Sequence, residues 1–134
     1  MKRVIKTIVI ASLLTIPFTL TAPAYADGDL KKGAKIFKKC AACHKIKKGA
    51  KSKSAPNLWN IVGRGIAEIE GFKYSKAFLS KKGTLVWNKE NLDDYITKPK
   101  KWEPKTKMAF AGIKKEKDRL DLISYLETMS DEKE

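Results

Sequence analysis

The sequence has few of the side chains that most often bind metals or catalyse hydrolysis. Its 134 residues include one histidine, His44, and two cysteines, Cys40 and Cys43. A structural zinc site built from nitrogen and sulfur takes four ligands, so the chain is one ligand short of such a site. All three residues lie within one pentapeptide, residues 40–44, and the chain is organised around it.

The sequence also lacks an apolar run long enough for a membrane anchor. Its most apolar segment, residues 7–20, is interrupted by a proline and several threonines, whereas a spanning helix needs about 20 consecutive apolar residues. Basic residues precede this segment, and Ala24-Tyr25-Ala26 follows it with the small-x-small pattern of a cleavage site. Residues 1–26 are therefore predicted to be a signal peptide that is cleaved after Ala26, and residues 27–134 the exported domain.

Acidic residues are also scarce, since 15 Asp and Glu stand against 29 Lys and Arg, which gives a net charge of +14. In an intracellular chain such an excess would suggest nucleic-acid binding. The lysines are scattered along the sequence, however, and an exported chain rarely meets nucleic acid. The excess instead favours two roles, which are keeping a small domain soluble and steering it toward acidic partner surfaces.

The pentapeptide Cys40-Ala41-Ala42-Cys43-His44 has the spacing of a c-type haem attachment site. Two thiols three positions apart can add to the two vinyl groups of one porphyrin, and the adjacent histidine then becomes the proximal ligand of the iron. A thioredoxin-like redox pair has the same spacing, but it would be expected within a βαβ unit, and no alternating apolar run here indicates a parallel sheet. We therefore expect one haem c, covalently bound through Cys40 and Cys43.

Helical periodicity and capping residues predict an all-α domain of four or five short helices wrapped around the haem. The first is expected over about residues 29–39, and Gly33 within it suggests a close contact with another helix. A second is expected over residues 74–79, and a third begins after Asn88 as N-cap and ends at a proline. The last is expected over about residues 115–130, with leucine and isoleucine along one face.

No second histidine remains for the other face of the iron or for a His-based catalytic triad. If the iron has a sixth ligand, sulfur is therefore the expected donor. Met129 belongs to the apolar stripe of the last predicted helix, where methionine ordinarily packs. Met108 lies instead in an irregular loop made rigid by Pro104, where a side chain can be aimed at a fixed target. Met108 is thus the leading candidate for the sixth ligand.

The sequence closely resembles the class I cytochromes c, and among them the small soluble branch shared by mitochondria and alphaproteobacteria. The agreement runs in order along nearly the whole exported domain, and it is highly specific. It includes the segments Cys40–His44, Pro56-Asn57-Leu58, Gly63-Arg64, Pro99-Lys100-Lys101, Thr106-Lys107-Met108 and Phe110–Lys115.

The resemblance implies the cytochrome c fold and a role for each matching residue. His44 and Met108 are expected to be the axial ligands, with the carbonyl of Pro56 accepting a hydrogen bond from the other imidazole nitrogen. Roles next to the haem propionates or the ligand sulfur are implied for five more residues: Tyr74, Trp87 and Thr106 as hydrogen-bond donors to the propionates or their surroundings, Arg64 as the group that offsets their charge, and Tyr95 as a partner of the Met108 sulfur. The resemblance also implies that Gly33 and Phe37 pack against the last helix.

Three features depart from the usual family pattern. Lys105 and Ala55 stand where the family usually has glycine, and each removes a backbone freedom from its loop. The interval from Tyr74 to Trp87 is slightly longer than in mitochondrial members. The longer interval favours a bacterial origin, so the predicted location of the exported domain is the periplasm.

The implied function is that of a one-electron carrier, not an enzyme, between a cytochrome bc complex and a terminal oxidase. It is expected to be a monomer that contacts membrane complexes at the membrane surface and binds no nucleic acid. Seven lysines would surround the exposed haem edge and meet an acidic docking surface: Lys39, Lys53, Lys100, Lys101, Lys107, Lys114 and Lys115. The alternative is a small haem peroxidase, which would need an open sixth position and a distal acid–base residue. A haem-sensing module is a third class, which the lack of a second domain disfavours.

Overall fold

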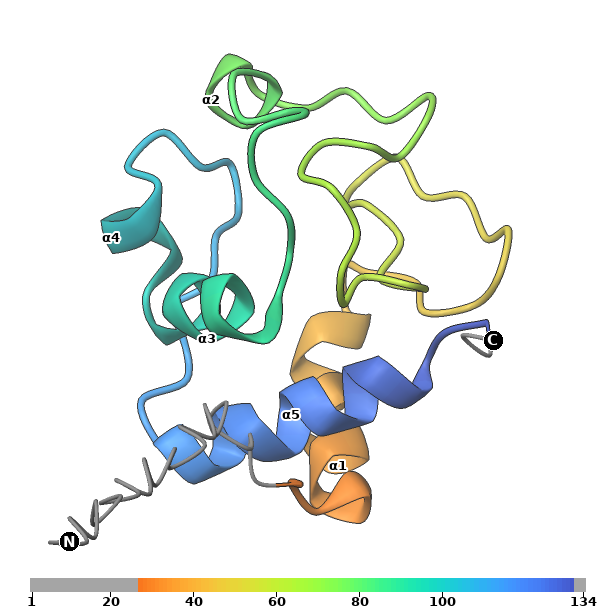
Figure 1. Cartoon of the computed structure of the whole chain (residues 1–134), viewed down its shortest axis with the longest axis vertical. Coiled ribbons are helices and arrows are strands. Elements are labelled where there is room, and N and C mark those ends of the chain that lie inside the picture. The colour runs from red at the N-terminus through yellow and green to blue at the C-terminus, as the bar shows by residue number, and fades with distance from the viewer. Residues whose placement is uncertain (1–26, 132–134) are drawn as a thin grey trace, which may run out of the picture.

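The computed structural model describes residues 27–131, and the predicted signal peptide lies outside this range. The described residues form five helices: α1 (Leu30–Ala41), α2 (Lys76–Leu79), α3 (Lys89–Thr97), α4 (Pro99–Trp102) and α5 (Glu116–Thr128). Figure 1 shows α1 and α5 crossing at one end of the domain, α3 and α4 on one side, long loops on the other, and α2 at the far end.

The predicted all-α domain of four or five short helices is confirmed. Residues 27–131 contain no strand, and their β-type pairing is confined to an isolated bridge between Gly65 and Val86. In the same range, no helix is both long enough and apolar enough to cross a membrane.

Short polar side chains explain where the first three helices begin. The Asp29 carboxylate accepts a hydrogen bond from the Lys32 amide at 3.0 Å, and Ser75 and Asn88 cap α2 and α3 in the same way. Each of these oxygens satisfies an amide that has no partner within its helix. The third helix ends just before a proline, as expected: α3 ends at Thr97, and Pro99 occupies the first turn of α4. Proline suits this position, because its missing amide hydrogen would have had no helical partner.

The first and last helices cross at Gly33, as expected. A Cβ atom at this position would lie 2.1 Å from the carbonyl oxygen of Asp121 on α5, so the two backbones approach more closely than any side chain allows. One turn further along α1, the ring of Phe37 packs against that of Tyr125, with 5.7 Å between their centroids. This crossing holds the C-terminal end of α1, and with it the cysteine motif, against the core.

Four aromatic rings form the core beneath α2, α3 and α4. Phe78, Trp87, Tyr95 and Trp102 all contact one another, with centroid separations between 5.1 Å for Trp87 and Tyr95 and 6.4 Å for Phe78 and Trp102. Each such pair adds attraction beyond the area that it buries. The cluster therefore fixes the side of the domain that lies opposite the long loops.

The two positions at which glycine is usual in the family do not need glycine here. Among residues 27–131, the non-glycine residues with positive φ are Asn60 at 57° and Ala67 at 62°. Ala55 and Lys105 are not among them, so their side chains cause no strain of the left-handed kind. The loop before Met108 accordingly accommodates lysine without a change in backbone type.

We expect Gly33→Ala to destabilise the fold. Helix propensity alone predicts the opposite, a gain of about 1 kcal/mol, because alanine is the better helix former. The added methyl group meets backbone atoms of Asp121, however, and such overpacking costs about 1–3 kcal/mol or more. Urea unfolding should therefore show a net loss in the free energy of unfolding. Lys31→Ala, at an exposed position of α1, should be nearly neutral, and a net gain for Gly33→Ala would contradict the close crossing.

Candidate haem-binding site

The two cysteines of the motif lie on either side of the end of α1. Cys40 is in its last turn, and the chain continues as a tight turn in which the amides of Cys43 and His44 donate to the Cys40 carbonyl at 3.0 and 2.9 Å. Both cysteines are free, Cys40 half-buried and Cys43 exposed. Burial raises the pKa of the Cys40 thiol, although Lys39 opposes this. The turn thus presents two thiols and an imidazole together, next to the core.

His44 is held in the form that can bind a metal. Its Nδ1 lies 2.7 Å from the carbonyl oxygen of Pro56, and because a carbonyl can only accept, Nδ1 carries the proton. Burial lowers the pKa of His44, and the nearby Arg64 charge adds to this, while the hydrogen bond to Pro56 opposes it. The neutral imidazole therefore keeps a lone pair on Nε2, the atom available to a metal.

The loop that supplies the Pro56 carbonyl is itself held by Asn57. The Asn57 side-chain amide donates to the carbonyls of Lys47 and Ala50 at 2.8 and 3.0 Å, and its oxygen accepts from the Trp59 amide at 3.0 Å. Sequence reasoning assigned no role to this residue, although its place directly after Pro56 in the Pro-Asn-Leu segment could have indicated one. Asn57 therefore supports the orientation of His44 through the backbone of its neighbour.

Arg64 has a buried N–H group that nothing in the described residues satisfies. Its two terminal nitrogens donate to the carbonyls of Trp59 and Asn57 at 2.7 and 3.0 Å, whereas its Nε has no partner within residues 27–131. An unpaired donor of this kind is costly in a buried position. A haem propionate is an anion that would satisfy it, so this residue fits the group that the motif implies.

The structure places Tyr74 and Trp87 near Arg64, and their expected roles beside the propionates stay predictions. The Tyr74 hydroxyl accepts a hydrogen bond from the Ile69 amide at 3.4 Å, and burial raises the pKa of Tyr74. Trp87 is buried within the aromatic cluster of the core.

Tyr95 is hydrogen-bonded to the loop that carries Met108. Its hydroxyl pairs with the Thr106 hydroxyl at 2.8 Å, and its expected contact with the Met108 sulfur stays a prediction. The same Thr106 oxygen accepts from the Met108 amide at 3.3 Å, and the Met108 side chain packs, half-buried, against the core. Tyr95 is thus connected to the Met108 loop through Thr106, because that hydroxyl lies within its reach.

The lysines expected at the docking surface are all exposed: Lys39, Lys53, Lys100, Lys101, Lys107, Lys114 and Lys115. None of them takes part in the ion pairs found among residues 27–131. Their charges are therefore available to a partner.

A sequence profile described as "Cytochrome c" matches residues 30–130 of the chain, nearly the whole of the described domain. The chain belongs to the cytochrome c family. Curated relatives named cytochrome c agree with this assignment. The protein of Stellaria longipes is 47% identical over 104 residues, which cover 77% of this chain and 94% of the relative.

Two further relatives extend the comparison beyond flowering plants. Cytochrome c of Chlamydomonas reinhardtii is 48% identical over 106 residues, covering 78% of this chain and 90% of the relative. Cytochrome c of Kluyveromyces lactis is 42% identical over 103 residues, covering 76% and 92%. The predicted membership of the class I cytochromes c and the predicted cytochrome c fold are confirmed.

Membership of the family establishes the cofactor and the general activity. Cytochromes c carry electrons between redox complexes, and their haem c is bound covalently through the cysteines of the motif, which are Cys40 and Cys43 in this chain. The prediction of one covalent haem c is therefore confirmed. The residues of the site fit this group, because His44 offers a free Nε2 and Arg64 a buried, unpaired N–H.

The prediction of a periplasmic location is wrong. The matched relatives are cytochromes c of a flowering plant, a green alga and a yeast, which are eukaryotes and have no periplasm. The prediction rests on residues 1–26, which lie outside the described residues, and on one slightly longer interval in the domain. A basic and apolar N-terminal segment does not distinguish compartments by itself, because several kinds of targeting segment combine these features.

We expect Arg64→Gln to lower the midpoint potential of the haem. Removing a half-buried positive charge next to the haem-binding site favours the oxidised state, which carries one more positive charge. A shift of about 60 mV would correspond to a tenfold change in the one-electron equilibrium. Redox titration should detect it, and Lys82→Gln, which removes an exposed charge, should leave the potential nearly unchanged. Equal shifts in both variants would mean that net charge, and not the Arg64 site, sets the potential.

Proposed function

We propose that this protein is a one-electron carrier whose haem iron is held between His44 and Met108, and that it passes electrons from a cytochrome bc complex to a terminal oxidase. The observation that carries the proposal is the 2.7 Å hydrogen bond from His44 Nδ1 to the Pro56 carbonyl, which leaves Nε2 as the metal ligand. The haem supplies the chemistry itself, a change of one charge at the iron.

The residues on the opposite side support Met108 as the second ligand. No other histidine exists in the chain, and Met108 is the methionine that lies in a loop fixed by hydrogen bonds, through the Thr106 hydroxyl to Tyr95. Methionine as axial ligand raises the reduction potential of the iron. Such a carrier belongs late in an electron-transfer chain, which is why a terminal oxidase is the proposed acceptor.

A closed iron site also argues for a carrier over a peroxidase. Peroxide chemistry needs an open coordination position and a residue that moves protons on the distal side. In this chain Met108 would occupy that position, and no second histidine is available as the proton-transfer group. We therefore propose that the protein has no enzymatic activity of its own.

The domain boundaries form part of the same proposal. Residues 27–134 would be the electron-carrying domain, and residues 1–26 an N-terminal segment that is removed. In support, the amides of Gly28 and Asp29 donate to Ser124 and Asp121 of α5 at 2.9 and 2.7 Å, so the domain is held together from its second residue onward.

Met108→Ala should keep the covalent haem but open the sixth coordination position. The midpoint potential should fall, and the oxidised protein should lose the far-red charge-transfer band of methionine-ligated iron and bind small ligands or peroxide. Absorbance spectra and redox titration of the purified protein would measure these changes. Met129→Ala, in the methionine at the end of α5, should leave the spectrum unchanged. If the two variants have the same spectrum, Met108 is not the ligand.

We expect two lysines of the docking surface, Lys107 and Lys114, to accelerate electron transfer by electrostatic steering. Reversing both charges should slow the reduction of an oxidase by the protein at low salt and have little effect at high salt. The salt dependence follows from the Debye length, which is about 8 Å near 0.15 M ionic strength.

Stopped-flow kinetics across a range of salt concentrations would test this. The matched control is reversal of Lys73 and Lys82, which are also exposed but lie outside the proposed surface. If both pairs slow the reaction equally at every salt concentration, net charge matters and the face does not.

A further inference from the structure

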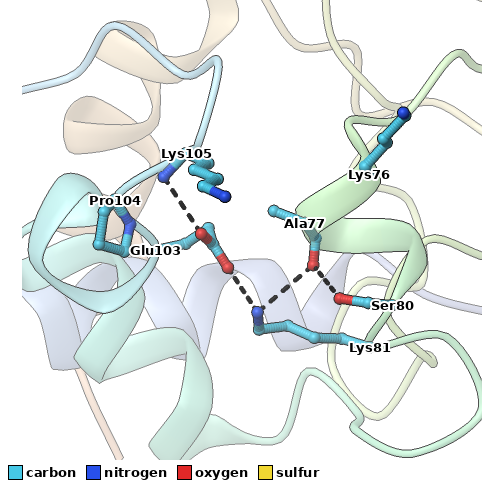
Figure 2. Close-up of a pocket in the computed structure, with 7 residues that line it drawn as sticks. All are labelled: Lys76, Ala77, Ser80, Lys81, Glu103, Pro104 and Lys105. Atoms are coloured by element: carbon cyan, nitrogen blue, oxygen red, sulfur yellow. Dashed lines mark hydrogen bonds and ion pairs between the residues drawn. The ribbon is translucent and has the colours of Figure 1, made fainter.

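Glu103 is an acidic side chain that the fold buries. Its residue is only 6% exposed, although carboxylates are rarely buried without a partner. One carboxylate oxygen forms an ion pair with Lys81, and the other accepts a hydrogen bond from the backbone amide of Lys105 at 3.1 Å (Figure 2). Both oxygens are thus satisfied, and each one connects Glu103 to a different segment.

The backbone of Glu103 joins α4 to the loop that carries Met108. Its amide donates to the Pro99 carbonyl at 2.9 Å and closes the last turn of α4, and its carbonyl accepts from the Thr106 amide at 3.0 Å. Pro104 follows directly and restricts the backbone to a narrow range of φ. Together with the side-chain bond to Lys105, these contacts make Glu103 the residue that shapes the turn over residues 103–106.

This turn leads to Met108 through Thr106. The Thr106 residue is buried, and its hydroxyl is hydrogen-bonded to Tyr95 at 2.8 Å and accepts from the Met108 amide at 3.3 Å. A displacement of the turn would therefore move the group that holds the Met108 backbone. The position of Glu103 and the position of Met108 are mechanically linked.

Lys81 anchors the other end of the ion pair in the segment that contains α2. Its side chain is 26% exposed, its Nζ also donates to the Ala77 carbonyl at 3.3 Å, and it lies 5.6 Å from the centre of the Trp102 ring. These two contacts already restrict the lysine side chain, so forming the ion pair costs little additional conformational entropy. Partial burial also shields the pair from salt.

We propose that the ion pair between Lys81 and Glu103 acts as a strap, which fastens the Met108 loop to the segment of residues 76–81 and so positions Met108 on the iron. Glu103 and Lys81 are positioning residues, because neither needs to touch the haem. The hydrogen bond from Lys81, followed by that from the Lys105 amide, lowers the pKa of Glu103, so the carboxylate stays charged at neutral pH. The inference rests on the proposed function, since it requires Met108 to be a ligand.

Imidazole binding to the oxidised holoprotein tests the strap, because imidazole can occupy the iron only while Met108 is displaced. Its apparent affinity therefore reports the fraction of molecules in which the Met108 loop is open. We expect Glu103→Gln and Lys81→Met each to bind imidazole about fivefold more tightly than the wild type, the upper range for a partly exposed ion pair. The double variant should bind no more tightly than the single variants, because both remove the same interaction.

Two further variants separate the strap from general effects on stability. Lys81→Arg keeps the charge and should bind imidazole like the wild type. Glu127→Gln removes the carboxylate of another ion pair, 2.7 Å from Lys89, between α5 and α3, and should also leave imidazole binding unchanged. Thermal unfolding followed by far-ultraviolet circular dichroism would establish that each variant is folded.

Wild-type affinity in both strap variants would overturn the proposal. A change in imidazole affinity in Glu103→Gln without one in Lys81→Met would also overturn it, because Glu103 would then act through the Lys105 turn alone. So would a double variant in which the effects of the two single variants add fully. Met108→Ala separates these failures from failure of the proposed function. If Met108→Ala binds imidazole no more tightly than the wild type, Met108 is not the ligand. If it binds more tightly while the strap variants do not, the strap alone is refuted.

Discussion

The hydrogen bond between His44 and the Pro56 carbonyl is the constraint on which the site depends. A histidine can bind a metal through only one nitrogen while the other is held, and here the 2.7 Å contact to Pro56 settles which one. The contact requires the end of α1 and the loop at residues 55–60 to stay in a fixed relation. Asn57 provides this by crosslinking its loop to the carbonyls of Lys47 and Ala50. The His44 ring is thus oriented by a backbone carbonyl, and the side chain of Asn57 holds the loop that supplies this carbonyl.

The close crossing of α1 and α5 fixes the position of the cysteine motif, as the Pro56 hydrogen bond fixes the orientation of His44. Gly33 lets the two backbones touch, which places the last turn of α1, and therefore Cys40, at a defined point of the domain. The aromatic cluster fixes the opposite side, where Tyr95 on α3 holds Thr106 and the loop of Met108. The haem of this family thus lies between a side held by helix packing and a side held by a loop. If Met108 is the ligand, as proposed, its position depends on the hydrogen bonds of this loop and not on helix packing.

Much of this arrangement can be predicted from local sequence. The caps Asp29, Ser75 and Asn88 and the spacing of the motif depend on neighbouring residues, so the helices α1 and α3 and the cofactor follow from short-range patterns. Gly33 also signals its contact, because a glycine within a helix is costly unless it permits close packing. The cellular location does not follow in the same way, because it was inferred mainly from the composition of residues 1–26, which lie outside the described residues.

Contacts between residues that are far apart in the sequence and belong to no motif could not be predicted. The Tyr95 hydroxyl could be paired with Thr106 or with the Met108 sulfur as far as the sequence shows, and the folded structure pairs it with Thr106. Lys81 and Glu103 are separated by 22 positions in a chain with 29 basic residues, so no pattern selects this lysine as the partner of that carboxylate. The burial of Glu103 determines which lysine pairs with it. A carboxylate that is removed from water must find a partner, and the lysine whose Nζ is already held beside Trp102 is the one within reach.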